Sequence, residues 1–174
     1  MPDNLKACSV TSYRNTPPQW PAQIVGSISH TRNTAIAAVS SAHRHLAIGI
    51  DCESVFEADT SAKVCDLILS NNDKLQFNRE RSNFCVSLTT VFSAKESLFK
   101  ALNPIIKRFF DFRDIDIYLN DNLNGFKATI NKPLTTTYPE GMSFTGSIIM
   151  QDKTIITYLS IDRAIAALEF EAVI

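Results

Sequence analysis

Apolar and polar positions alternate, or apolar residues form short runs, in two separate parts of the chain. Each such stretch is bounded by turn residues, which is the pattern that predicts β-strands. The predicted strands cover residues 26–30 (a strand or a turn), 35–39, 45–50, 114–119, 126–130, 143–150 and 154–161. Turns at 40–44 and 151–153 predict that the strands on either side of each turn pair as hairpins. We expect 35–39 to be a buried strand.

Between the two groups of strands, apolar residues recur at helical spacing. Residues 59–69 predict a helix with Val64, Leu67 and Ile68 on its apolar face, capped by one of the polar residues Asp59, Thr60 and Ser61. The polar stretch 71–81 predicts a loop with room for a short helical turn.

The longest helical pattern covers residues 83–102, and Pro104 is expected to help stop that helix. A short helix is expected over 162–173. Strands, then helices, then strands in this order predict an α+β protein with antiparallel sheets and one long helix.

Composition narrows the class of protein. With 174 residues, 45% apolar and 20% charged, the chain is typical of a soluble globular protein of one domain or two small halves. A formal net charge of −1 gives no general attraction to nucleic acid, so we expect no nucleic-acid partner. No apolar run approaches the ~20 residues of a membrane span. The first residues lack the regions of a signal peptide, and four cysteines without CxxC spacing predict reduced thiols in a cytoplasmic protein.

Two carboxylates at the end of an apolar strand are the first candidate for chemistry. Asp51 and Glu53 are two residues apart, so their side chains point to the same face of the strand. Two acids on one face repel each other unless a cation or a base lies between them. The alternative is an exposed strand end with two solvated acids.

A third acid, Glu96, lies in the long predicted helix beside Lys95 and four residues before Lys100. In isolation, Glu96 and Lys100 would be an ordinary surface pair on one helical face. The apolar residues around them favour burial, where polar groups need partners. Three acids and nearby lysines suit a hard cation and a phosphate group, which together indicate chemistry on a diphosphate.

Histidines occur in two further patterns. Ser29 and His30 follow a glycine and suit phosphate binding, but a serine–histidine hydrolase pair and a plain core or turn histidine are alternatives. Neighbouring residues of a strand point to opposite faces, which argues against the hydrolase pair. His43 and His45 could bind a transition metal only with further ligands, and a solvated turn is the alternative. Trp20 is either a packing anchor or the wall of a binding cleft.

Three blocks of the sequence resemble the 4′-phosphopantetheinyl transferases, specifically those of the siderophore-synthase type. The first block comprises Arg14, then Trp20-Pro21, then Gly26-Ser27-Ile28-Ser29-His30. The second is Gly49-Ile50-Asp51-Cys52-Glu53, and the third is Phe92-Ser93-Ala94-Lys95-Glu96-Ser97-Leu98-Phe99-Lys100. They occur in the family's order, and the last two together are highly specific.

The resemblance implies transfer of the 4′-phosphopantetheine arm of coenzyme A to a serine of an apo peptidyl, aryl or acyl carrier protein. Adenosine 3′,5′-bisphosphate is released, and the pathway is expected to be siderophore or nonribosomal peptide synthesis. It also implies roles for residues. Metal ligands for Mg²⁺ are Asp51, Glu53 and Glu96; catalytic residues are Glu96 and Lys100; coenzyme A contacts are Arg14, Ser29, His30, Asp51, Lys95 and Lys100. The base is either Glu96 or a metal-bound water.

The family fold is a pseudo-dimer of two similar halves with the site between them. The match divides the chain into an N-terminal half at 1–53, which binds coenzyme A, and a C-terminal half at 54–174, which carries the metal-site helix. Residues 54–82 would face the carrier protein, with Phe56, Leu67 and Leu69 as contacts. Only about a dozen residues precede Arg14, so the first half is expected to be shortened. We expect the protein to act as a monomer. The alternative functions are a non-catalytic remnant that binds coenzyme A or a carrier protein and, less favoured, a metal-dependent phosphodiesterase.

Overall fold

A computed structural model describes residue 10 and residues 17–76 and 83–163. These residues form two antiparallel sheets, one long helix and shorter helices. The predicted α+β class is confirmed. The elements are β1 (Ile24–His30), β2 (Ala35–Ser41), β3 (His45–Ser54), α1 (Ala58–Ile68), α2 (Asn71–Gln76), α3 (Phe84–Ile106), the 3₁₀ turn η1 (Phe112–Asp114), β4 (Ile115–Leu119), β5 (Gly125–Ile130), β6 (Ser143–Gln151) and β7 (Thr154–Asp162). None of these helices is long and apolar enough to cross a membrane.

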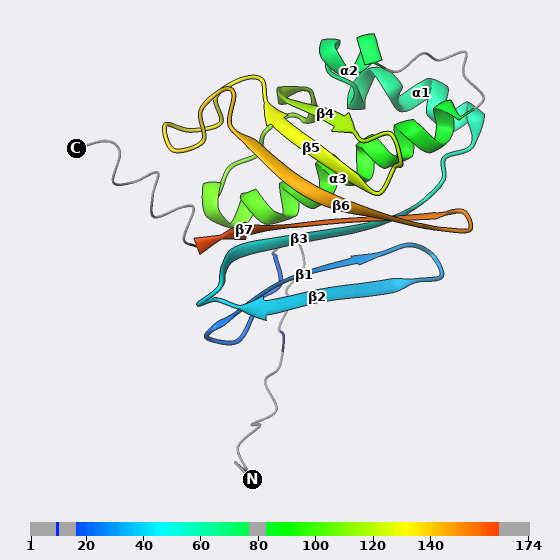
Figure 1. Cartoon of the computed structure of the whole chain (residues 1–174). Helices are drawn as coiled ribbons and strands as arrows, with labels where there is room; N and C mark the ends of the chain where they lie inside the picture. Colours follow the sequence, from blue (N-terminus) through cyan, green and yellow to red (C-terminus); the bar gives the residue numbers. More distant parts are fainter. Residues whose placement is uncertain (1–9, 11–16, 77–82, 164–174) are drawn as a thin grey trace.

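The large sheet has the strand order β3-β7-β6-β5-β4, and β1 and β2 form a separate pair beside β3 (Figure 1). The predicted β6–β7 hairpin is confirmed. The predicted hairpin between 35–39 and 45–50 is wrong, because β2 pairs with β1 and β3 pairs with β7 along its length. The expected burial of 35–39 is also wrong: residues along β2 alternate between exposed and half-buried, and Val39 is 62% exposed.

Serine hydroxyls of β1 join the small sheet to β3. The backbone N–H groups of Ile50 and Cys52 donate to Ser27 Oγ at 3.1 Å and Ser29 Oγ at 3.2 Å. These N–H groups belong to the edge of β3 that does not face β7. The two serine side chains therefore accept hydrogen bonds from N–H groups at the edge of the large sheet. In a continuous sheet, backbone carbonyl groups of a neighbouring strand would accept these bonds.

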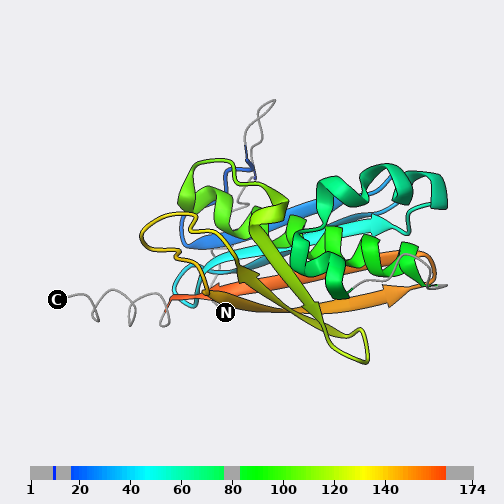
Figure 2. The ribbon, with the colours of Figure 1, turned by 90° about the horizontal axis from the view of Figure 1, so that it is seen from above.

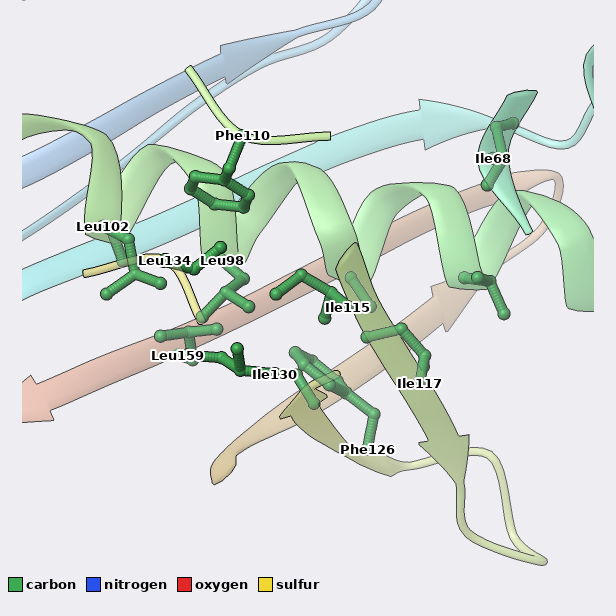
Figure 3. Packing of buried hydrophobic residues seen from close by; sticks show 14 of the residues in the cluster. Ile68, Leu98, Leu102, Phe110, Ile115, Ile117, Phe126, Ile130, Leu134 and Leu159 are labelled. Carbon is green, nitrogen blue, oxygen red and sulfur yellow. The ribbon is translucent and has the colours of Figure 1, made fainter. Parts of the chain in front are cut away.

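The core lies between α3 and the large sheet. Figure 3 shows Leu98 and Leu102 of α3 among Ile115, Ile130 and Leu159 of the strands, and all five are 3% exposed or less. Helix α3 runs past the predicted stop, with Pro104 inside its last turn and Lys107 as a left-handed C-cap at φ 56°. The apolar periodicity therefore located this helix but not its end.

Helix α1 follows its predicted range, and Val64 and Ile68 of its predicted apolar face pack in or against the core. Its predicted cap and the predicted burial of Leu67 are wrong. Its N-cap is Glu57, which makes no side-chain capping bond, so none of the three proposed caps is used. Leu67 is 67% exposed and faces solvent, whereas Cys65 and Ile68 are buried. The predicted short helical turn after it is α2. Figure 1 and Figure 2 both show α1 and α2 near the N-terminal end of α3.

The parts of the described chain before and after residue 53 differ in their elements. Within residues 17–53 there are strands but no helix, whereas the following residues supply the helices and the other strands. Because β3 pairs with β7, the first part contributes an edge strand to the large sheet. The division at residue 53 stays a prediction. The helix predicted over 162–173 falls almost entirely outside the described residues.

Candidate active site

Gly49 lets the long helix approach the strand that carries the two acids. A Cβ atom at Gly49 would lie 1.7 Å from the carbonyl oxygen of Ser97 and 2.7 Å from its carbonyl carbon. Only a residue without a side chain fits this contact, because no real Cβ comes so close to a backbone atom. Asp51 lies two residues after Gly49, and Ser97 directly follows Glu96. The contact therefore brings the two acidic motifs together.

Asp51 is the centre of a buried polar cluster, with only 2% of the residue exposed. Its Oδ1 atom accepts hydrogen bonds from Ser29 Oγ at 2.9 Å and from Lys100 Nζ at 2.7 Å. Lys100 Nζ also donates to Ser29 Oγ at 2.9 Å. The structure thus joins three predicted site residues from β1, β3 and α3 in one network.

Glu53 and Glu96 belong to the same electrostatic cluster. Burial, followed by repulsion from Asp51 and then Glu96, raises the pKa of Glu53 to about 7, while Lys100 opposes the shift. Burial and then Asp51 also raise the pKa of Glu96 above its usual value, again opposed by Lys100. The Asp51 carboxylate thus destabilises the charged forms of Glu53 and Glu96, and the cluster favours the binding of positive charge.

The chemistry of these residues fits a hard divalent cation. Three carboxylates supply the oxygen ligands that Mg²⁺ prefers. Asp51 Oδ2 is buried and has no hydrogen-bond partner, which leaves this oxygen atom available to a cation. Within the described residues, however, no three His, Cys, Asp or Glu side chains are already arranged to hold a metal ion. Lys100 supplies the positive charge next to Asp51.

The structure does not bring Lys95 to this cluster. The expectation that it contacts coenzyme A phosphates does not match its position, because its side chain is completely buried in an ion pair with Asp73. Burial lowers the pKa of Lys95, and the Asp73 carboxylate opposes that shift. The side chains of successive helix residues point about 100° apart, so Lys95 and Glu96 have different neighbours.

The remaining predicted residues differ in their outcome. His30 is exposed at the end of β1, where its Nδ1 lies 3.3 Å from the Thr31 carbonyl oxygen. Arg14 lies outside the described residues. His45 contacts Ser40 Oγ at 2.7 Å through Nδ1 and Asp162 at 3.2 Å through Nε2, so both ring nitrogens have protein partners and it does not form a metal site with His43.

An apolar cavity of about 430 Å³ lies next to the cluster, between β1, β3 and the C-terminal end of α3. Lys100, Trp20 and Phe99 are among its lining residues. A Cβ atom at Gly26 would lie 2.7 Å from the Trp20 ring, so the absence of a side chain at Gly26 lets the indole pack against β1. Trp20 is thus both a packing anchor and a cavity wall. Sequence reasoning missed the packing roles of Gly26 and Gly49, although a glycine inside an apolar strand is a usable signal of close approach.

Comparison with known proteins agrees with these motifs. The family model described as 4′-phosphopantetheinyl transferase superfamily matches residues 47–147, and that of the 4′-phosphopantetheinyl transferase N-terminal domain matches residues 4–40. The chain belongs to the 4′-phosphopantetheinyl transferase superfamily. The first match includes Asp51, Glu53, Glu96 and Lys100, and the identification made from the motifs is confirmed.

Relatives of the siderophore type are among the similar proteins. Enterobactin synthase component D of Escherichia coli is 42% identical over 84 residues, which cover 48% of this chain and 39% of that protein. The 4′-phosphopantetheinyl transferase Svp of Streptomyces mobaraensis is 28% identical over 120 residues, covering 69% of this chain and 49% of that protein. The matched segments thus span less than half of these relatives.

Two solved structures are also similar. The holo-ACP-synthase of Plasmodium yoelii has a TM-score of 0.48 at 14% identity, covering 66% of this chain and 92% of that one. The holo-(acyl-carrier-protein) synthase of Bacillus anthracis has a TM-score of 0.44 at 17% identity, covering 68% and 97%. With TM-scores below 0.5, neither structure gives information about the site of this chain.

Proposed function

We propose that this chain transfers the 4′-phosphopantetheine arm of coenzyme A to a serine hydroxyl of an apo carrier protein and releases adenosine 3′,5′-bisphosphate. The observation that supports this most is the Asp51–Ser29–Lys100 network beside Glu53 and Glu96. The cluster combines three carboxylates, which could bind a metal ion, with a lysine, which could bind a phosphate oxygen. Both are needed to bind a diphosphate together with a metal ion. Family membership and the siderophore-type relatives support the same reaction.

Asp51, Glu53 and Glu96 are the proposed ligands of Mg²⁺. The ion would neutralise charge on the diphosphate of coenzyme A and so favour departure of the bisphosphate. The unpartnered Oδ2 atom of Asp51 supports this assignment. Ser29 uses its hydroxyl on Asp51 and is therefore proposed to orient that carboxylate.

Lys100 is the proposed diphosphate contact. Its side chain is 27% exposed, so the ammonium group can exchange Asp51 for a phosphate oxygen without losing a charged partner. His30 remains a proposed contact of the adenosine 3′-phosphate, and Arg14 is proposed to add a positive charge near the nucleotide. The serine proton would pass to Glu96 or to water, and both acceptors stay open.

The carrier protein is proposed to dock on the segment containing α1 and α2. Leu67 is 67% exposed and Leu75 is 85% exposed, which makes both available to an apolar partner surface. Leu69 is only 1% exposed and belongs to the core. Leu69 is therefore not a suitable carrier contact, although the family resemblance suggested it as one. We propose a peptidyl or aryl carrier of siderophore synthesis as the partner, and a cytoplasmic monomer as the acting form.

Chromatography of the nucleotide products tests the reaction class. The chain is incubated with coenzyme A and Mg²⁺, with and without an apo peptidyl carrier protein. We expect adenosine 3′,5′-bisphosphate only when the apo carrier is present. Release without carrier would indicate a phosphodiesterase, and coenzyme A binding without release for any of several carriers would indicate a binding remnant.

A further inference from the structure

A completely buried lysine directly precedes Glu96 and has no part in the chemistry proposed above. The side chains of Lys95 and Asp73 are both 0% exposed. Lysine is almost never fully buried unless it is paired, because removing its charge from water is costly. The position of this pair in the fold therefore calls for a physical reason.

The ammonium group of Lys95 connects helix α3 to three other elements. It donates to Asp73 Oδ2 in α2, to the carbonyl oxygen of Ile68 at the end of α1 at 2.9 Å, and to that of Phe112 in η1 at 2.9 Å. An ammonium group has three donors. All three are thus used on protein atoms from different elements.

Asp73 extends the connection to β4. Its Oδ1 accepts from the backbone N–H of Ile117 at 2.8 Å, and its Oδ2 accepts from the N–H of Ser70 at 3.0 Å. A second buried carboxylate, Asp116, accepts from Ser70 Oγ at 2.6 Å and from Asn72 Nδ2 at 2.7 Å. The ends of α1 and α2 are therefore tied to both α3 and β4 through buried polar groups.

We propose that Lys95 is a positioning residue: with Asp73 it forms a clamp that holds the α1–α2 segment on α3 and thereby fixes Glu96 relative to the carrier-facing surface. This inference rests on the proposed function. It replaces the phosphate contact that the sequence suggested for Lys95. The clamp would link the place where the carrier docks with the helix that supplies Glu96 and Lys100.

An ion pair is a poor choice where only stability is required. Well-packed apolar residues stabilise a core as well or better, whereas a buried pair requires one arrangement of its partners. Here the pair joins α3 and α2, and its partners come from α1, η1 and β4. These elements meet one residue before Glu96. Fixed geometry at this junction is the property that an apolar contact would not supply.

Steady-state kinetics on the full chain test the clamp. The variants are Lys95→Met, Asp73→Asn and both together, with Ile130→Val as the control in the core of β5. Assays are run at a temperature where circular dichroism shows every variant folded. We expect Lys95→Met to lower kcat about 10- to 100-fold, since a displacement near 1 Å has effects of that order. The KM for coenzyme A should change less than about threefold, because the clamp does not touch it.

The double variant distinguishes the pair from two separate effects. Lys95→Met leaves the Asp73 charge buried and unpaired, and Asp73→Asn in the same chain removes that charge. We expect the double variant to regain part of kcat, while Ile130→Val lowers Tm and keeps kcat. A raised KM for coenzyme A with unchanged kcat would make Lys95 a phosphate ligand. Unchanged kcat and KM would make the pair a stability device. Either result overturns the proposal.

Hydrogen exchange separates failure of the clamp from failure of the proposed function. If the unmodified chain yields no product, the transferase proposal fails, but exchange at residues 71–76 still measures the clamp. Faster exchange there in Lys95→Met than in Ile130→Val, at equal distance below Tm, supports the clamp. Equal protection in both variants overturns it.

Discussion

Replacing Gly49 by alanine tests the contact that brings the two acidic motifs together. The added Cβ would lie 1.7 Å from Ser97 O and 2.7 Å from Ser97 C, and both atoms are backbone that no rotamer change can move. Ordinary van der Waals contact begins near ~3.4 Å, so α3 and β3 must separate by roughly 1.5 Å. Overpacking of a core typically costs ~1–3 kcal/mol and occasionally more. We expect the upper end, about 3 kcal/mol, because the obstacle is helix backbone.

The same shift would move Glu96 and Lys100 away from Asp51. A displacement of this size is expected to lower kcat by about 100-fold in molecules that remain folded. Urea denaturation gives the free energy of unfolding, and product formation at low urea gives kcat.

Gly125→Ala is the matched control for this prediction. A Cβ there would lie 3.2 Å from Asn120 Nδ2, a side-chain atom that can shift, and 3.3 Å from Gly146 O. We expect a loss below about 1 kcal/mol and normal kcat. The reasoning is refuted if Gly49→Ala unfolds within 0.5 kcal/mol of the unmodified chain, a difference on the order of ordinary surface substitutions, and keeps its activity.

Three further substitutions test other parts of the site. Lys100→Met should weaken binding of adenosine 3′,5′-bisphosphate about tenfold by calorimetry, because a charge-assisted hydrogen bond is lost; unchanged affinity would remove Lys100 from the phosphate site. Ser29→Ala leaves Asp51 and the N–H of Cys52 without their hydroxyl partner, and should lower the free energy of unfolding by ~1–3 kcal/mol in urea denaturation; a loss below 0.5 kcal/mol, about the range of surface substitutions, would argue against this network. Leu67→Ser should raise the carrier KM at constant Tm and coenzyme A KM, whereas Leu69→Ser should lower Tm sharply; an unchanged carrier KM for Leu67→Ser would place docking elsewhere.

Local patterns predicted much of the fold. The alternation and turn at 143–161 correctly gave β6, β7 and their pairing, and helical spacing gave most of α3. Spacing also predicted that Asp51 and Glu53 share a face and that Lys100 lies near the acids. These properties depend on residues close together in sequence, where the period of the element decides side-chain direction.

Contacts between distant elements could not be predicted in the same way. The apolar residues of α3 surround much of the helix, so periodicity did not show that Lys95 pairs with Asp73 of α2 while Glu96 interacts with Asp51 of β3. The pairing of β3 with β7 depends on partners at least one hundred residues apart. The exposure of Leu67 depends on which side of α1 meets α3 and η1, and its own sequence fits either choice.

The central claim is that the acids around Asp51 and the lysine at position 100 carry phosphopantetheinyl transfer. Intact-mass measurement of an apo peptidyl carrier protein, incubated with coenzyme A, Mg²⁺ and either the unmodified chain or Glu96→Gln, tests it most directly. We predict that the carrier gains one phosphopantetheine group with the unmodified chain and none with Glu96→Gln. No gain with the unmodified chain on several carriers, or an equal gain with the folded variant, would contradict the account.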